Sequence, residues 1–159
     1  MAIHIVLYQP EIPANTGNIA RTCLATNAKL HLIHPLGFST DDKMLRRAGL
    51  DYWHDVDIYN HDSLADLYQA HPNGNFYYIE NFGTKYYTDF DFSEANQDLF
   101  FVFGRETNGI PRELLVGKEE RCLRIHMADN DKVRSLNLSN TAAILVYDVL
   151  KQQGFPNMH

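Results

Sequence analysis

Residues 98–104 read DLFFVFG, and this nearly continuous run of apolar and aromatic side chains decides the fold class. A second run of the same kind, NFYYIE, occupies residues 75–80. Strands that are apolar on both faces are typical of a parallel sheet with helices covering both sides. The two stretches therefore predict the central strands of a buried, parallel sheet.

The segments around these two runs alternate between strand and helix patterns. Further strands are predicted at 3–8, 29–35, 55–59 and 121–127, and helices at 17–27, 41–50, 62–71, 110–116 and 138–153. Asn15 or Thr16 is expected to cap the first helix, and Gly154 to follow the last one. The alternation predicts one domain over residues 1–159, with an open α/β fold, a mainly parallel sheet and helices on both faces.

Composition and simple motifs exclude several classes of protein. The 159 residues contain no apolar run near the roughly 20 residues that cross a bilayer. The first residues lack the pattern of a signal peptide, so a cytoplasmic protein without a membrane partner is expected. Cys23, Cys122 and the scattered histidines fit no metal-ligand spacing, so no metal is expected. No Walker or G-x-G-x-x-G motif is present, which disfavours standard nucleotide sites.

The charge distribution leaves a nucleic-acid partner open. The formal net charge of −6 argues against phosphate binding. However, Lys43, Arg46 and Arg47 have helical spacing and could share one basic face. A solvated charged face is the commoner arrangement, and the pattern does not decide between the two.

Polar residues gather in the loops that are expected to follow strands, where ligands of open α/β sheets bind. Gly104 directly follows a buried strand, and a missing side chain there would let a ligand approach the backbone. Glu106 is either a surface carboxylate or an acceptor for a ligand or a neighbouring loop. The stretch before the last helix contains more polar residues than one helix cap needs: Arg134, Ser135, Asn137, Ser139 and Asn140.

Three ordered motifs carry a resemblance to a known family. They are NTGNIARTC (15–23), LFFVFGRETNGIP (99–111) and the pair LRIHM (123–127) and RSLNLSNTAAILVYDVL (134–150). They resemble the motifs of the SpoU/TrmH-type RNA 2′-O-ribose methyltransferases of the SPOUT superfamily. Essentially the whole chain is similar to the short, single-domain branch that methylates the wobble nucleotide of tRNA. The resemblance implies a deep C-terminal trefoil knot, S-adenosylmethionine as cofactor, tRNA as substrate, and a homodimer.

The resemblance also implies a role for individual residues. The cofactor is expected to bind at Ile79, Gly104, Ile125, Met127, Ser135 and Leu136. The expected catalytic residues are Arg21, Glu106, Asn137 and Tyr147, and the expected RNA contacts are Lys43, Arg46, Arg47 and Arg134. Because a guanidinium is a poor proton acceptor near neutral pH, we expect Arg21 to act mainly by electrostatic stabilisation.

Two features of the sequence depart from the family pattern. Arg105 stands where family members often have proline, so this loop is expected to be less rigid or to reach RNA. The stretch 128–133 is slightly longer than in similar proteins.

Two alternative functions stay open. They are a non-catalytic RNA- or nucleotide-binding module, and a nucleotide-dependent oxidoreductase, which the missing dinucleotide fingerprint disfavours. The last helix has a second apolar face, assigned to Ala143, Tyr147 and Leu150, which could cover a sheet in a monomer or pack against a second copy. The resemblance favours the dimer.

Overall fold

The core of the molecule is a single parallel sheet. A computed structural model of the chain describes residues 2–41, 43, 45, 47, 50–94, 96 and 98–159. Seven strands in these ranges pair in the order β3-β2-β1-β6-β4-β7-β5, and every pairing is parallel. The strands are β1 (Ile3–Tyr8), β2 (Lys29–Ile33), β3 (Ile58–His61), β4 (Asn75–Ile79), β5 (Lys85–Tyr86), β6 (Leu99–Phe103) and β7 (Cys122–Arg124). The predicted parallel α/β architecture is confirmed.

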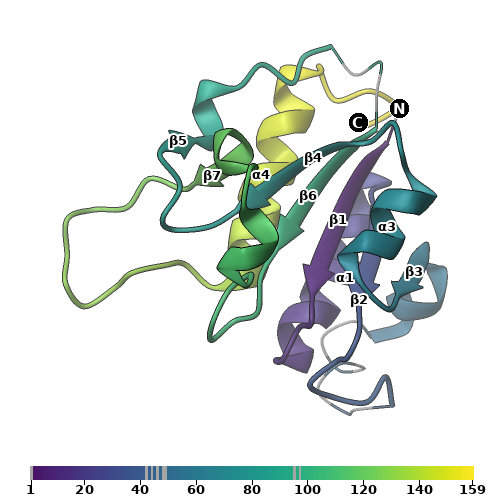
Figure 1. The fold of residues 1–159 in the computed structure, drawn as a ribbon. Helices are drawn as coiled ribbons and strands as arrows, with labels where there is room; N and C mark the ends of the chain where they lie inside the picture. Colours follow the sequence, from purple (N-terminus) through teal and green to yellow (C-terminus); the bar gives the residue numbers. More distant parts are fainter. Residues whose placement is uncertain are drawn as a thin grey trace.

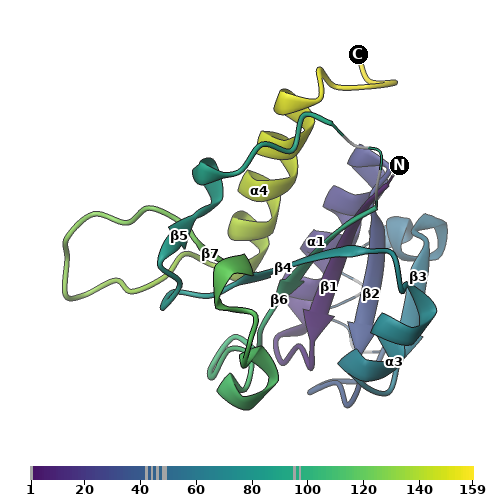
Figure 2. The same cartoon turned by 45° about the horizontal axis from the view of Figure 1, so that its top comes forward.

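Helices cover both faces of this sheet. The helices α1 (Pro13–Thr26) and α4 (Leu138–Gln152) lie on one face, and α3 (Leu64–Ala70) lies on the other (Figures 1 and 2). Along β6, Phe101 and Phe103 belong to the core beneath α1 and α4, whereas Phe100 and Val102 belong to the core beneath α3. All five residues of β6 are buried. The apolar run is therefore continuous because both faces of this central strand are covered.

The predicted helix ends are wrong at the start of α1 and correct at the end of α4. Helix α1 starts at Pro13, and its N-cap residue Ile12 makes no side-chain capping bond. Asn15 and Thr16, the expected caps, are buried inside the helix. Proline is favoured in the first turn because its fixed φ suits a helix and its missing N–H would be unpaired there anyway. Gly154 follows α4 with a φ of 77°, as predicted.

Local irregularities account for the other differences. Residues 110–116 form a 3₁₀ turn, η3 (Arg112–Leu115), instead of an α-helix. Strand β3 begins later than predicted, β7 is shorter, and the two-residue strand β5 is too short to give a periodic signal. The remaining 3₁₀ turns are η1 (Leu50–Asp55), η2 (Tyr87–Asp89) and η4 (Glu119–Arg121). Residues 43, 45 and 47 of the predicted 41–50 helix are helical.

A row of histidines crosses three neighbouring strands on the α3 side. His4 Nδ1 lies 2.8 Å from His31 Nε2, and His31 Nδ1 lies 2.9 Å from His61 Nε2. The row ends at Asp98, whose Oδ2 lies 3.5 Å from His4 Nε2. Burial lowers the pKa of His4 to about 4 and that of His31 to about 3. Both imidazoles are therefore neutral in the folded protein near neutral pH, and each can donate one hydrogen bond and accept another.

None of the helices in the described ranges combines the length and hydropathy that a membrane crossing requires.

Candidate active site

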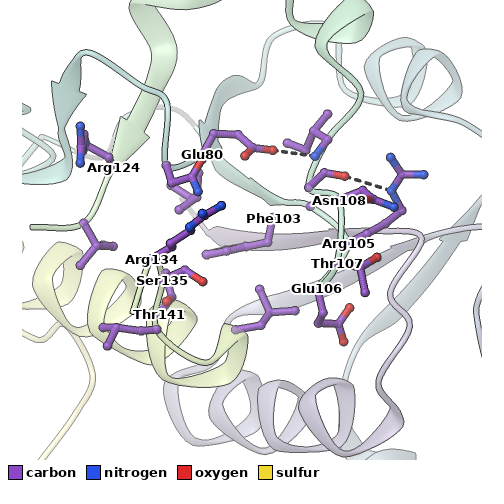
Figure 3. Close-up of a pocket in the computed structure, with 18 of the residues that line it drawn as sticks. Glu80, Phe103, Arg105, Glu106, Thr107, Asn108, Arg124, Arg134, Ser135 and Thr141 are labelled. Carbon is purple, nitrogen blue, oxygen red and sulfur yellow. Dashed lines mark hydrogen bonds between the residues drawn. The ribbon is translucent and has the colours of Figure 1, made fainter. Parts of the chain in front are cut away.

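A cavity of about 800 Å³ opens where the carboxyl ends of β4, β6 and β7 meet the N-termini of α1 and α4 (Figure 3). Four chain segments that are distant in sequence form its walls. Its lining residues are Ile12, Asn15, Ile79, Glu80, Asn81, Phe82, Phe103, Gly104, Arg105, Glu106, Thr107, Asn108, Gly109, Ile110, Arg112, Arg124, Ile125, Met127, Arg134, Ser135, Leu136, Asn137, Leu138 and Thr141. The carboxyl edge of a parallel sheet is where ligands of open α/β folds bind.

The turn of residues 104–110, here called the β6 turn, forms a closely packed wall. Its backbone closes between Arg105 and Gly109, with N–H···O distances of 3.3 and 2.9 Å in the two directions. Arg105 Nε donates a further bond of 3.0 Å to the Gly109 carbonyl. A Cβ atom at Gly104 would lie 2.4 Å from the carbonyl carbon of Gly109 and the nitrogen of Ile110. Gly104 is therefore required by the turn itself, in addition to any contact with a ligand.

Two glutamates fasten the β6 turn to the loop before α1. The carboxylate of Glu106 accepts bonds from the backbone N–H groups of Glu11 (2.9 Å) and Ile12 (2.7 Å). In return, the carboxylate of Glu11 accepts bonds from the backbone N–H (3.0 Å) and hydroxyl (2.8 Å) of Thr107. The bond from the Thr107 backbone lowers the pKa of Glu11. Glu106 thus holds the N-terminal end of α1 against the cavity.

Asn15 links this pair of loops to the last helix. Its Nδ2 donates to Glu106 Oε2 at 3.3 Å, and its Oδ1 accepts from Asn137 Nδ2 at 3.0 Å. Asn137 also caps α4, because its Oδ1 accepts from the backbone N–H groups of Ser139 and Asn140. The surplus of polar residues before α4 is partly explained, since one asparagine both caps the helix and binds a residue of the first motif.

Two charged residues of the cavity, Glu80 and Arg124, were not among the site residues predicted from the sequence. The half-buried Glu80 accepts a bond of 2.6 Å from the backbone N–H of Ile110, and burial raises the pKa of its carboxyl group. Arg124 Nε is buried without a hydrogen-bond partner among the described residues. The sequence placed Glu80 at the carboxyl end of the predicted strand run 75–80, next to a loop expected to bind ligands, and this position is the feature that could have identified it.

The segment 125–137, here called the β7 loop, forms an open wall. Residues 128–137 are exposed, and the loop extends away from the sheet in both views (Figures 1 and 2). Arg134 and Ser135 nevertheless line the cavity from this loop (Figure 3). The hydrogen bonds that the described residues show within the loop are short-range ones at Asn130, to the N–H groups of Lys132 and Val133.

The cavity unites most of the residues predicted from the sequence. All six expected cofactor residues line it, together with Glu106, Asn137 and Arg134. Arg21 and Tyr147 are not among its lining residues; Arg21 is exposed on α1, and Tyr147 is 44% exposed on the outer side of α4. Their distance from the cavity follows from their places on the two helices, beyond the first turn of each.

The expected basic face can be described only in part. Lys43 and Arg47 are exposed, and Arg46 lies outside the described residues. The loop that leads to them is tied to the cavity side, because the Gly37 N–H donates to the Pro10 carbonyl at 2.9 Å. Among the described residues, no group of three or more His, Cys, Asp or Glu side chains is placed to hold a metal ion.

Comparison with known proteins gives a consistent family assignment. The sequence profile of the SpoU rRNA Methylase family matches residues 2–147. A Geobacillus stearothermophilus protein with the provisional name tRNA (cytidine(34)-2′-O)-methyltransferase is 67% identical over 98% of both chains.

Solved structures agree over nearly the full chain. A protein of Bacillus anthracis, provisionally described as an RNA methyltransferase, superposes with a TM-score of 0.91 at 58% identity, covering 99% of this chain and 98% of its own. A structure described as giving insights into the 2-OH methylation of C/U34 on tRNA superposes with a TM-score of 0.87 at 38% identity, covering 96% of this chain and 97% of its own.

Proposed function

The chain belongs to the SpoU methylase family, and we propose that it transfers a methyl group from S-adenosylmethionine to the ribose 2′-hydroxyl of the wobble nucleotide, position 34, of tRNA. The fold is accordingly the SPOUT fold, to which the trefoil knot belongs. The names of the similar proteins support tRNA and position 34. The observation that carries the proposal is the single cavity in which all six expected cofactor residues meet Glu106 and Asn137.

The cavity fits the proposed cofactor on two grounds of its own. Gly104 lines the cavity with its backbone at the end of β6, and the close packing of the β6 turn holds that backbone in place. The buried Nε of Arg124 has no hydrogen-bond partner in the described part of the chain, and it is a donor that a polar ligand would satisfy. When bound, S-adenosylmethionine supplies a methyl group that its sulfonium already activates, so that alignment accounts for much of the rate. Ser135 and Leu136 would close the cavity from the β7 loop.

Arg21 would act on the substrate and not on the cofactor. A guanidinium keeps its proton near neutral pH and carries several donors in a fixed plane. Arg21 would hold the phosphate beside the target ribose and stabilise the charge that develops on the 2′-oxygen. Because Arg21 lies outside the cavity of its own chain, its role fits an active site that a second copy completes. Tyr147, also outside, would contribute in the same way, while Arg134, Lys43, Arg46 and Arg47 would contact RNA.

A homodimer built on α4 would provide this second copy. Ile144 and Tyr147 are 37% and 44% exposed on the outer side of the helix. Leu150, assigned from the sequence to this outer side, is instead buried in the core, because it faces the sheet together with Val146 and Val149. An outer face of aliphatic and aromatic side chains favours association. Light scattering at low micromolar concentration tests it, and a monomer with full activity would contradict it.

The whole chain would work as one domain in the cytoplasm, where tRNA is modified. The single sheet to which both halves of the chain contribute strands supports one domain.

The test of the activity is transfer of labelled methyl groups into total tRNA, followed by nucleoside mapping. We expect the label in the ribose of nucleotide 34. Label in a base would overturn the reaction, and cofactor binding without any transfer would favour a non-catalytic RNA-binding module.

The matching test of the site is Arg21→Ala under single-turnover conditions with saturating tRNA. We expect the rate to fall by about 10²–10³, as for the loss of an electrostatic stabiliser, with unchanged cofactor affinity. Arg21→Lys should recover little activity because it lacks the planar fork. Arg121→Ala, which removes another exposed arginine, is the control and should keep its rate. An Arg21→Ala rate within a few-fold of wild type would refute the assignment.

A further inference from the structure

Glu80 occupies a distinctive position in the cavity. It is the first residue after β4 and directly follows Ile79, one of the expected cofactor residues. Its side chain reaches across the cavity toward the β6 turn (Figure 3). An acidic side chain at the carboxyl end of a parallel strand is also the device by which dinucleotide-binding folds bind a ribose.

The structure holds the Glu80 carboxylate in one place. Its Oε1 accepts the 2.6 Å bond from the Ile110 N–H. Gly109 packs against both oxygens, since a Cβ atom there would lie 2.7 Å from Oε1 and 2.9 Å from Oε2. Gly109 has a φ of 64°, a conformation that favours glycine, and so allows this close approach. A fixed acceptor of this kind is suited to recognising a ligand.

The carboxylate has fewer donors than it can accept. An ionised carboxylate offers about four acceptor positions, and the described residues give Glu80 one hydrogen bond and no ion pair. Arg105 and Arg112 lie close enough to lower its pKa, but burial has the larger effect and raises it. Because Glu80 is half-buried and lines the cavity, its unused acceptor positions are available to donors of a ligand bound there.

The local charge selects among the donors of the cofactor. S-adenosylmethionine offers the adenine amino group, two vicinal ribose hydroxyls and an ammonium group. The positive potential of Arg105 and Arg112 opposes a third cation, which disfavours the ammonium. A single amino group would fill one acceptor position, whereas two vicinal hydroxyls would fill two.

We propose that Glu80 determines cofactor affinity in this protein by accepting hydrogen bonds from the ribose hydroxyls of S-adenosylmethionine. The inference rests on the proposed function, and it adds a residue that the family motifs in this sequence do not include.

Calorimetric titration with the product S-adenosylhomocysteine and with its 2′-deoxy and 3′-deoxy analogues tests this. In the wild type, removing a hydroxyl that Glu80 binds should weaken binding by about tenfold or more, as expected for hydrogen bonds to a charged group. Glu80→Gln should bind the full ligand at least about tenfold more weakly. It should also discriminate between the full and deoxy ligands by no more than two- to three-fold.

Two further variants keep the result interpretable. Glu80→Asp keeps the charge but withdraws it by one methylene, and should lose the discrimination as well. Glu113→Gln makes the same charge change at an exposed residue that is not among the cavity's lining residues, and should behave as wild type. If folded Glu80→Gln, checked by thermal unfolding, still discriminates as the wild type does, the ribose assignment is wrong. If the wild type itself does not bind S-adenosylhomocysteine, the proposed function fails together with the inference.

Discussion

The two walls of the cavity differ in how they are held. The β6 turn closes on itself through Arg105 and Gly109 and is fastened to the loop before α1 by Glu106 and Glu11. The β7 loop contributes four of the six expected cofactor residues, whereas the β6 turn contributes Gly104. Yet residues 128–136 of this loop are exposed, and the hydrogen bonds that the described residues show there are short-range ones at Asn130. Hydrogen bonds of the folded chain therefore hold the β6 turn, whereas the β7 loop has fewer of them. We therefore expect ligand binding to change the β7 loop more than the β6 turn.

The largest expected effect is a loss of stability, at low pH, of the sheet that carries both walls. The pKa values of His4 and His31, about 4 and about 3, lie below the ordinary value of 6.5. The unfolded chain therefore binds more protons between about pH 3 and 6.5, and the free energy of unfolding falls as the pH falls through this window. Burial is the main cause for both histidines. Lys29 and His71 lower both pKa values further, His61 lowers that of His31, and Asp98 raises that of His4.

Chemical denaturation at a series of pH values between 7.5 and 4 measures this loss. The upper limit is on the order of 3 kcal/mol for each of the two histidines. His31→Gln should flatten the profile, while His159→Gln at the exposed C-terminus should leave it unchanged. A His31→Gln profile as steep as that of the wild type would contradict the role of the histidine row.

The next largest effect is expected from a substitution that disrupts the β6 turn. Gly104→Ala places a Cβ atom 2.4 Å from the backbone of Gly109 and Ile110, so we expect about 1–3 kcal/mol of destabilisation from overpacking and loss of cofactor binding. Gly117→Ala is the comparison for backbone strain without a clash, because its φ of 81° disfavours alanine while a Cβ there meets nothing within 4 Å; it should keep cofactor binding. Denaturation and titration calorimetry measure both; a Gly104→Ala protein that binds as the wild type would show that the turn adapts.

A smaller effect is expected from weakening the hydrogen bonds that join the β6 turn to the loop before α1. Glu106→Gln keeps the size of the side chain but replaces one accepting oxygen with an amide that faces N–H donors. We expect a loss of about 1–2 kcal/mol in the free energy of unfolding and a lower methyl-transfer rate, since the N-terminal end of α1 is no longer held. Thermal and urea unfolding measure the stability, with Glu113→Gln as the control. Equal stabilities of the two variants would show that the carboxylate charge at residue 106 does not hold the wall.

The smallest effect on stability should come from the open wall. Ser135→Ala removes a hydroxyl from an exposed position of the β7 loop, so the free energy of unfolding should stay within about 0.5 kcal/mol of wild type while cofactor affinity falls. Amide hydrogen exchange sharpens the comparison. Residues 128–136 should exchange rapidly without ligand and slowly with S-adenosylhomocysteine, whereas the Gly109 N–H, bonded to the Arg105 carbonyl, should be protected in both states. Equal protection of the two walls without ligand would remove the distinction.

The sequence by itself determined the parts that depend on local pattern. The apolar runs 75–80 and 98–104 gave the strands β4 and β6. All five residues of β6 are buried because both of its faces are covered, whereas four of the five residues of β4 are half-buried. The ordered motifs gave the family and the residues Ile79, Gly104, Ile125, Met127, Ser135 and Leu136, which all reach one cavity.

Only the tertiary structure decided which residues of distant chain segments are in contact. Asn15 was predicted as a helix cap, but it joins Glu106 and Asn137, which are 91 and 122 positions away in the chain. Glu80 faces the β6 turn because β4 pairs with β6. Contacts of this kind leave no local signature, because a hydrogen bond depends on where two backbones meet and not on the residues beside each partner. The order of the strands sets those meetings, and periodicity carries no information about strand order.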